Sequence, residues 1–201
     1  MEFDIEFRAA FDHAMIYEVG PFWDPTDPDV INGLIMTRDQ RRKVGYVNDK
    51  FDRGGETKYG IAKNANPNVS VGTLNLKQAM GIYFDRYWKA GCCDILSYPL
   101  NYLHFDGCVN HGVGRGCKFL QAACGIPPQG QDGIIGPKTL AILDKKDGYK
   151  LGVSICEQRT RFYKAIVANN PGQGRFLNGW LRRINEMRAY IDQNRYRDQN
   201  V

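Results

Sequence analysis

The sequence predicts a mainly α-helical fold with a small β-hairpin lobe near the N-terminus. Apolar side chains recur every three to four residues through residues 3–17 and from residue 75 onward, which is the spacing of one face of an α-helix. Residues 30–61 instead carry short apolar pairs around glycine turns. A chain of 201 residues, 43% of them hydrophobic, can bury a sizeable core, so we expect a single domain with two lobes.

The first helix is expected to end near Val19, because Gly20 and then Pro21 break it. This places Glu18 in the last turn of the helix. The residues of its apolar face are Phe3, Phe7, Ala10, Phe11, Ala14 and Tyr17.

Residues 21–43 are expected to hold a β-hairpin. Asn32-Gly33 stands between short apolar runs, and this dipeptide favours the two-residue turns that join antiparallel strands. Gly54-Gly55 marks a second turn, so residues 30–61 are predicted to form the β lobe.

The remaining chain is predicted to be helical. Asn75 is a suitable N-cap for the next helix, and Pro137 suits the first turn of a later one. The other expected helices cover residues 100–110, 115–124, 149–169 and 175–195.

Composition limits the function classes. No apolar run approaches the roughly 20 residues that a membrane span needs. The net charge of +5 favours anionic partners without naming one. Nucleic acid is not expected, because the basic residues are scattered and no aromatic stacking motif occurs. The six cysteines contain no C-x2-C pair, so we expect buried apolar thiols and neither a metal site nor a cofactor.

Glu18 is the first candidate for chemistry. Cleavage of a glycosidic bond needs a carboxylic acid that stays protonated near neutral pH, which an apolar environment provides. The aromatic residues Tyr17, Phe22 and Trp23 surround Glu18 in the sequence. The alternative is a solvent-facing glutamate at a helix end. Trp23 itself either stacks on a sugar ring or packs the expected hairpin onto the helices.

Asp52 and Thr57 flank the Gly54-Gly55 turn. A carboxylate and a hydroxyl that point into one cleft can hold a water molecule for attack. The alternative is an ordinary turn that Asp52 caps. Further along, Asp106 and Asn110 precede a helix break, where they are expected to bond the backbone and also contact a sugar substrate.

Several segments, in order, resemble one family. They are DRGGETKYGI (52–61), QAMGIYFDRYW (78–88), FDGCVNHGVGRGCKFLQAACG (105–125), DGIIGPKTLAIL (132–143) and FLNGWLRRI (176–184). Together they resemble the phage and bacterial N-acetylmuramidases of glycoside hydrolase family 108, whose signature is DxGGxTxYGI. The match extends over most of the chain, and the last two segments are similar to the family's peptidoglycan-binding segment.

The resemblance implies a single lysozyme-like domain over residues 1–201. Residues 1–100 would form the catalytic lobe with a β-hairpin insertion at 21–43, and residues 101–201 the peptidoglycan-binding lobe. It implies hydrolysis of the β-1,4 bond between N-acetylmuramic acid and N-acetylglucosamine. Asp52 and Thr57 carry over as catalytic residues, and Tyr59 is expected at the substrate.

The catalytic Glu of the family stands in an EGGY motif, and here the sequence departs from it. Counting back from Asp52 reaches Lys43, in KVGYVND, and a lysine cannot act as a carboxylic acid. Glu18-Val19-Gly20 has the right helix before it. We therefore infer an insertion of roughly two dozen residues between Glu18 and the GYVND segment.

The predicted function is that of a phage endolysin that cuts bacterial peptidoglycan and lyses the host cell. The N-terminus lacks the pattern of a secretory signal. The expected location is the host cytoplasm with delivery by another agent such as a holin, or the virion. The alternatives are a lytic transglycosylase and a non-catalytic wall-binding or virion protein.

The C-terminal helix is expected to present a basic face. It carries arginines at 175, 182, 183, 188, 195 and 197, expected mostly outward, while Phe176, Trp180, Ile184, Met187 and Ile191 pack inward. Such a face favours anionic peptidoglycan or an anionic membrane surface, and the alternative is an ordinary solvated face. The protein is expected to be a monomer.

Overall fold

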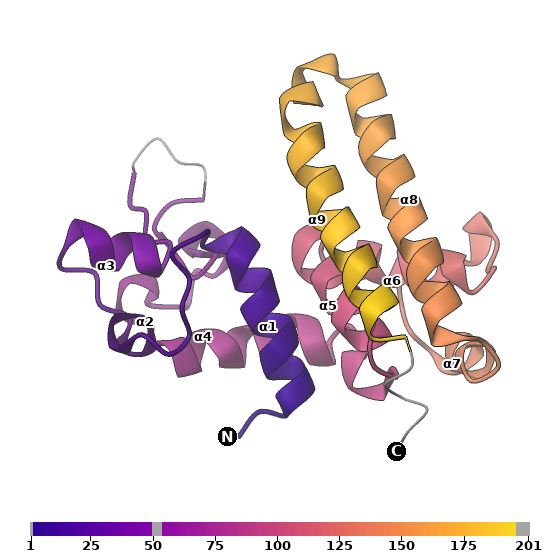
Figure 1. Cartoon of the computed structure of the whole chain (residues 1–201), viewed down its shortest axis with the longest axis horizontal. Helices are drawn as coiled ribbons and strands as arrows, with labels where there is room; N and C mark the ends of the chain where they lie inside the picture. Colours follow the sequence, from indigo (N-terminus) through magenta and orange to yellow (C-terminus); the bar gives the residue numbers. More distant parts are fainter. Residues whose placement is uncertain (1, 50–53, 196–201) are drawn as a thin grey trace. The chain divides into compact units, whose positions relative to one another are not determined.

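The computed structural model describes residues 2–49 and 54–195. The fold is mainly α-helical and lysozyme-like, as the sequence predicts. The chain forms two compact units, Met1–Asp85 and Arg86–Val201 (Figure 1). Among the described residues, no helix is both long enough and apolar enough to span a membrane.

The first unit is organised around helix α1 (Ile5–Glu18). The Asp4 carboxylate caps it by accepting a hydrogen bond from the Phe7 amide at 2.6 Å. Phe7 and Phe11 are fully buried and meet the rings of Phe84 and Tyr83 edge-on, with centroids 5.0 and 5.2 Å apart. Helix α4 (Leu76–Tyr83) therefore packs against α1, and the predicted Asn75 cap at its start is confirmed by a capping box with Gln78.

The prediction of a β-hairpin in residues 21–43 is wrong. The segment forms two short helices, α2 (Pro28–Asn32) and α3 (Arg38–Lys43). Asn32 ends α2, and Gly33 caps it in the left-handed region with φ +67°. A helix C-cap needs the same positive φ as a hairpin turn, so Asn-Gly suits both. The Asp27 cap and the Pro28 first turn select the helix.

The hairpin of this unit lies later in the chain. Strands β1 (Thr57–Lys58) and β2 (Ile61–Ala62) pair antiparallel, with Lys58 opposite Ile61. The connecting residues Tyr59 and Gly60 both have positive φ, +52° and +72°, as a two-residue type I′ turn requires. The β lobe is therefore much smaller than residues 30–61.

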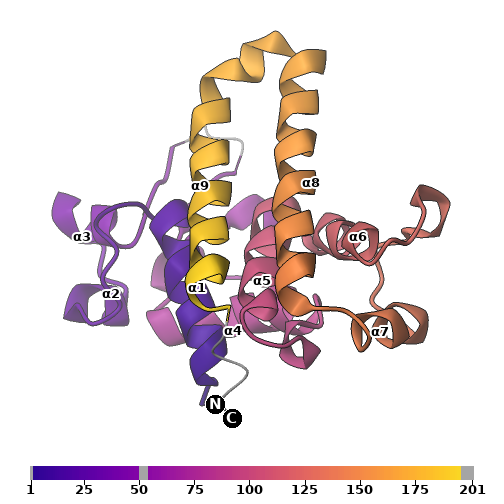
Figure 2. The ribbon, with the colours of Figure 1, turned by 45° about the vertical axis from the view of Figure 1, so that its right-hand side comes forward.

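The second unit is a helical assembly. Its helices are α5 (Leu100–His111), α6 (Val113–Ala123), α7 (Pro137–Leu143), α8 (Gly148–Asn169) and α9 (Gly174–Gln193), preceded by the short turn η4 (Cys93–Ile95). Figures 1 and 2 show α8 and α9 side by side as an antiparallel pair. Helix α5 is buried along most of its length and lies against α6 and α8.

A buried ion triad joins three helices of this unit. Asp106 on α5 accepts hydrogen bonds from the Arg159 Nη2 on α8 at 2.7 Å and from the Arg183 Nε on α9 at 2.8 Å. The Arg183 Nη2 lies 2.7 Å from the same carboxylate as an ion pair. The three residues are at most 6% exposed. We call Asp106, Arg159 and Arg183 the buried triad.

The triad corrects one expectation for the C-terminal helix. Arg183 was expected to face outward, but it lies on the inward side of α9 next to Ile184, where Asp106 pairs with it. Arg175 and Arg182 are exposed as expected. Arg197 lies outside the described residues.

Candidate functional site

Glu18 ends α1 directly beside the turn of the hairpin. A Cβ placed on Gly60 would lie 3.0 Å from the Glu18 Cβ and 2.6 Å from the Tyr83 hydroxyl. A contact this close leaves no room for a side chain at position 60, which also needs a positive φ. The last turn of the first helix and the GGETKYGI segment are therefore in contact within the first unit.

The two ends of the segment between Glu18 and GYVND also meet. Gly45, with φ +59°, would place a Cβ 3.2 Å from the Val19 Cα. The residues that follow run alongside the hairpin, because Val47 exchanges both backbone hydrogen bonds with Thr57 at 3.0 and 2.8 Å. The Tyr59 amide donates to the Val44 carbonyl at 2.8 Å. In space, the chain thus continues from Val19 to the GYVND segment, with residues 20–43 looped out.

The looped-out segment is anchored from the hairpin. The buried Lys58 ammonium donates to the Gly33 carbonyl at 2.6 Å and to the Gly72 carbonyl at 2.9 Å. The Tyr59 hydroxyl donates to the Val30 carbonyl at 2.5 Å. Burial lowers the pKa of Lys58, which the nearby Glu56 partly offsets.

Lys43 occupies the position that counting back from Asp52 assigns to the acid. Its ammonium lies 2.9, 3.1 and 3.2 Å from the carboxylates of Asp27, Asp29 and Asp39. Hydrogen bonds to these carboxylates, that of Asp27 first, raise the pKa of Lys43. This side chain is a permanent cation that ties α2 to α3, and it has no proton-donor role near neutral pH.

Of the two expected partners of Glu18, only Thr57 is described. It is half-buried on β1, and its hydroxyl donates to the Gly55 carbonyl at 3.1 Å. The hydroxyl oxygen retains lone pairs that can accept a hydrogen bond from water. Asp52 lies outside the described residues, so its pairing with Glu18 stays a prediction.

Two residues expected at the substrate pack inside the first unit instead. Tyr59 is fully buried, with its hydroxyl committed to Val30, so it is a core residue of the turn. Trp23 is half-buried and meets the rings of Phe11 and Tyr59 edge-on, with centroids 5.9 and 6.2 Å apart. It packs the looped-out segment onto α1, and its expected stacking on a sugar ring stays a prediction.

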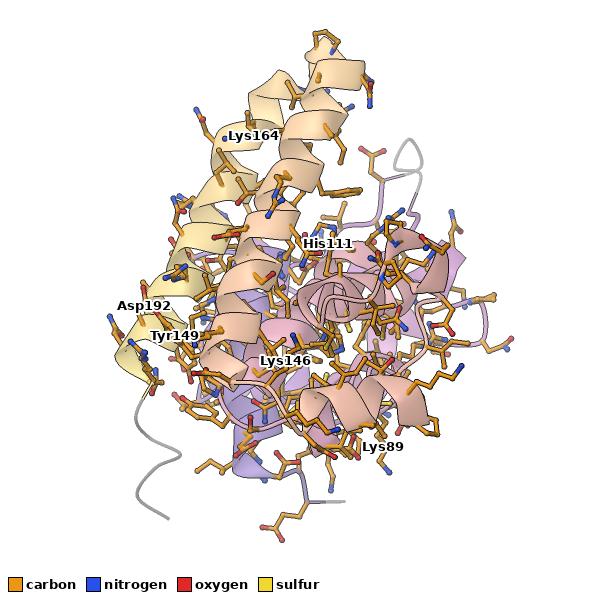
Figure 3. All side chains as sticks on the ribbon, turned by 90° about the vertical axis from the view of Figure 1, so that its right-hand side faces the viewer. Lys89, His111, Lys146, Tyr149, Lys164 and Asp192 are labelled. Carbon is orange, nitrogen blue, oxygen red and sulfur yellow. The ribbon has the colours of Figure 1, made fainter. Side chains whose placement is uncertain are left out.

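Asp106 and Asn110 belong to the second unit. The carboxylate of Asp106 is enclosed in the buried triad, which accounts for its polar side chain without a substrate. Asn110 is half-buried and accepts a hydrogen bond from the Tyr163 hydroxyl. The Nε2 of His111, which is labelled in Figure 3, lies 3.2 Å from that hydroxyl. Burial is the main cause that lowers the pKa of His111 to about 3, and the positive charge of Arg159 lowers it further.

Asp12 is a carboxyl of α1 with a raised pKa that the sequence did not single out. Burial raises the pKa of Asp12 to about 6, although the Trp23 indole and the Arg8 guanidinium oppose the shift. The side chain lines a cavity of about 390 Å³ together with Arg8, Lys77 and Met80. The burial of Asp12 could not be predicted from the sequence, because it depends on the path of the looped-out segment.

The raised pKa predicts how Asp12 affects stability. Between pH 3.8 and 6 the unfolded chain loses this proton before the folded chain does, so stability falls as pH rises through that window. Asp12→Asn has no charge to bury, and we expect it to raise the Tm at pH 8 while changing the Tm little at pH 3.5. Thermal unfolding from pH 3.5 to 8 measures this. Parallel pH profiles for the variant and the wild type would rule the effect out.

Comparison with known proteins places these residues in context. The model of the family described as Glycosyl hydrolase 108 matches residues 40–112, and that of the Predicted Peptidoglycan domain matches residues 115–185. Among solved structures, the chain is similar to the structure of Brucella abortus SagA, at 29% identity and a TM-score of 0.59. That similarity covers 72% of this chain and 84% of the other. No curated protein matches the chain.

Proposed function

Because this chain belongs to the glycosyl hydrolase 108 family and is a peptidoglycan-degrading enzyme, we propose that it is an N-acetylmuramidase with Glu18 as its acid. The bond cleaved is the β-1,4 bond between N-acetylmuramic acid and N-acetylglucosamine. The family match begins at residue 40, so the assignment of Glu18 depends on the geometry of the first unit.

The contact between Val19 and Gly45 carries the proposal. The looped-out segment begins and ends at one place, which supports an insertion that keeps Glu18 next to the GYVND segment. Gly60 then sets the side chain of Glu18 against the GGETKYGI turn. Lys43 stands where counting back from Asp52 would put the acid, and its ammonium forms salt bridges with three aspartates.

In the proposed reaction, Glu18 donates its proton to the glycosidic oxygen as the bond to the N-acetylmuramic acid C1 breaks. Asp52 and the Thr57 hydroxyl hold the water that adds to C1, with Asp52 accepting the proton of that water. Glu18 is then reprotonated from solvent, and Asp52 releases its proton to solvent. The separation of the two carboxyl groups determines whether the anomeric configuration is inverted or retained.

We place this reaction in phage-induced lysis. The enzyme would accumulate in the host cytoplasm and reach the wall when another agent, such as a holin, opens the membrane, or it would enter with the virion. The peptidoglycan domain match at residues 115–185 supports the wall as its binding partner.

Digestion of purified peptidoglycan, with mass analysis of the fragments, tests the proposal. A muramidase releases fragments that end in reducing N-acetylmuramic acid. Fragments that end in an anhydro-sugar would instead identify a lytic transglycosylase. Binding to the wall without any new fragment would identify a non-catalytic protein.

The exposed arginines of α9 predict a dependence on salt. Arg182 is 73% exposed in its side chain, and Arg175 is also exposed. Attraction of such charges to an anionic wall is screened within about 8 Å at physiological ionic strength. We expect lysis of whole walls to fall steeply with added salt, and Arg175→Gln/Arg182→Gln to flatten that fall.

The matched control is Lys77→Gln/Lys89→Gln, which removes the same charge from exposed positions outside the residues that the peptidoglycan domain model matches. It should keep the wild-type salt curve. A short soluble glycan should be cut at nearly the same rate at all salt concentrations. Identical curves for the arginine variant and the wild type would exclude a role of this face in wall binding.

A further inference from the structure

Sulfur and imidazole groups gather where three elements of the second unit meet. The Cys93 thiol on η4 and the His104 imidazole and Cys108 thiol on α5 have ligand atoms that all lie within 4.8 Å of one another. The Cys117 thiol on α6 lies 4.0 Å from the His104 Nε2. All four side chains are at most 1% exposed. The proposed reaction uses none of them.

The backbone around this cluster is shaped to admit the sulfur atoms. A Cβ on Gly91 would lie 2.9 Å from the Cys108 Sγ, and a Cβ on Gly116 would lie 2.8 Å from the same atom. His104 and Cys108 are four residues apart on α5 and so share one face. Cys92 adopts the left-handed region with φ +56° directly before Cys93, an unfavourable conformation for a residue with a side chain.

The polar atoms around the His104 Nε2 outnumber what one nitrogen can satisfy. The Gly91 carbonyl oxygen lies at 2.9 Å, the Cys108 Sγ at 3.6 Å and the Cys117 Sγ at 4.0 Å. A ring nitrogen either donates one proton or offers one lone pair. A cation in the centre of the cluster would satisfy the nitrogen and the sulfurs together.

The distances fit a tetrahedral metal site. With Zn–S near 2.3 Å and Zn–N near 2.0–2.1 Å, neighbouring ligand atoms of a tetrahedron lie about 3.5–3.8 Å apart. The separation of 3.6 Å from the His104 Nε2 to the Cys108 sulfur lies in this range. Cys93, His104 and Cys108 form the group whose ligand atoms all lie within 4.8 Å of one another. The Cys117 sulfur lies 4.0 Å from the nitrogen and outside that group, so its side chain has to move inward to become the fourth ligand. Thiolate and imidazole ligands select Zn²⁺ over hard cations such as Mg²⁺ or Ca²⁺.

We propose that Cys93, His104, Cys108 and Cys117 bind one structural Zn²⁺. On binding, the three thiols release their protons to solvent. The His104 Nε2 binds through its lone pair, so the ring carries its proton on Nδ1, and the Gly91 carbonyl oxygen, which lies 2.9 Å from Nε2 without the ion, turns away to make room for it. Four protein ligands leave no open position for substrate, so the ion stabilises the junction of η4, α5 and α6 and takes no part in hydrolysis.

Metal binding by the full chain tests the proposal. The protein is purified under reducing conditions, stripped with a chelator and titrated with Co²⁺, whose tetrahedral thiolate complexes absorb characteristically. We expect one Co²⁺ per chain, with charge-transfer and visible bands that Zn²⁺ abolishes by displacement. Zn²⁺ should also raise the Tm of the stripped protein and protect thiols from alkylation, three of them per chain.

Cys108→Ser should lose the cobalt bands and the Tm increase. Cys156→Ser replaces an equally buried cysteine of α8 outside the cluster and should keep both. If Cys108→Ser does not fold, the cobalt spectrum of the wild type and its alkylation rates with and without Zn²⁺ are sufficient to test the proposal. A wild-type chain without thiolate–cobalt bands, or with equal alkylation rates with and without Zn²⁺, overturns the proposal, whatever the outcome of the peptidoglycan digestion.

Discussion

Glu18→Gln is expected to fold normally and to lose nearly all lytic activity. Glutamine has nearly the same shape as glutamate but cannot donate the proton that the leaving oxygen needs, and general acid–base catalysis contributes roughly 10²–10⁴-fold. Turbidity loss of purified walls at equal protein concentration measures the rate, and the Tm confirms folding. If Glu18→Gln keeps more than about a tenth of the wild-type rate, Glu18 does not make the contribution expected of the catalytic acid.

The control uses the other unusual carboxyl of the same helix. Asp12→Asn changes a half-buried group of α1 whose pKa is raised to about 6, a value that would also suit a general acid. Asp12 is not placed against the GGETKYGI turn as Glu18 is, so Asp12→Asn should keep wild-type lysis. Loss of activity in Asp12→Asn with activity retained in Glu18→Gln would move the acid to Asp12.

The features that the sequence predicted well are local ones. The periodicity of residues 3–17 and the break at Gly20-Pro21 predicted α1 and the place of Glu18 at its end. The Asn75 cap was also readable, because a capping box lies within four consecutive residues. Asn32-Gly33 shows where local signals fail, since a helix end and a hairpin ask for the same backbone conformation.

The features that the sequence did not predict depend on contacts between distant positions. The family resemblance implied an insertion between Glu18 and GYVND, but nothing in the sequence near Gly45 shows that its backbone contacts Val19. The cluster of Cys93, His104 and Cys108 could not be read from the sequence, because it forms no C-x2-C pair and its members come from two elements, η4 and α5. Asp106 was expected to bond the backbone and to contact a sugar. Its two arginine partners could not be predicted, because they lie 53 and 77 residues further along the chain.

Asp106→Asn is expected to destabilise the second unit strongly. The carboxylate is the shared partner of two buried guanidinium groups, and its loss leaves both of them without a compensating charge. Removing one partner of a buried ion pair costs about 3–5 kcal/mol. Urea unfolding at pH 7, followed by the far-UV circular dichroism of this mainly helical chain, measures the change.

The pH dependence of unfolding separates this effect from a packing defect. Burial opposes ionisation of Asp106, but Arg159 and Arg183 overcome it and lower the pKa of Asp106 to about 2, below its ordinary 3.8. The contribution of Asp106 is therefore complete above pH 3.8 and is lost as pH falls toward 2, whereas Asp106→Asn lacks it throughout. The free energies of unfolding of wild type and variant should converge as pH falls through this window.

The matched control is Asp192→Asn on the surface of the same unit. Asp192 pairs with Arg188 at 3.0 Å and accepts from the Tyr149 hydroxyl at 2.9 Å, and Figure 3 shows Tyr149 and Asp192 at the same end of the α8–α9 pair. An exposed pair of this kind contributes about 0–1 kcal/mol. Equal losses of stability at pH 7 in Asp106→Asn and Asp192→Asn would show that the buried triad does not hold α5, α8 and α9 together.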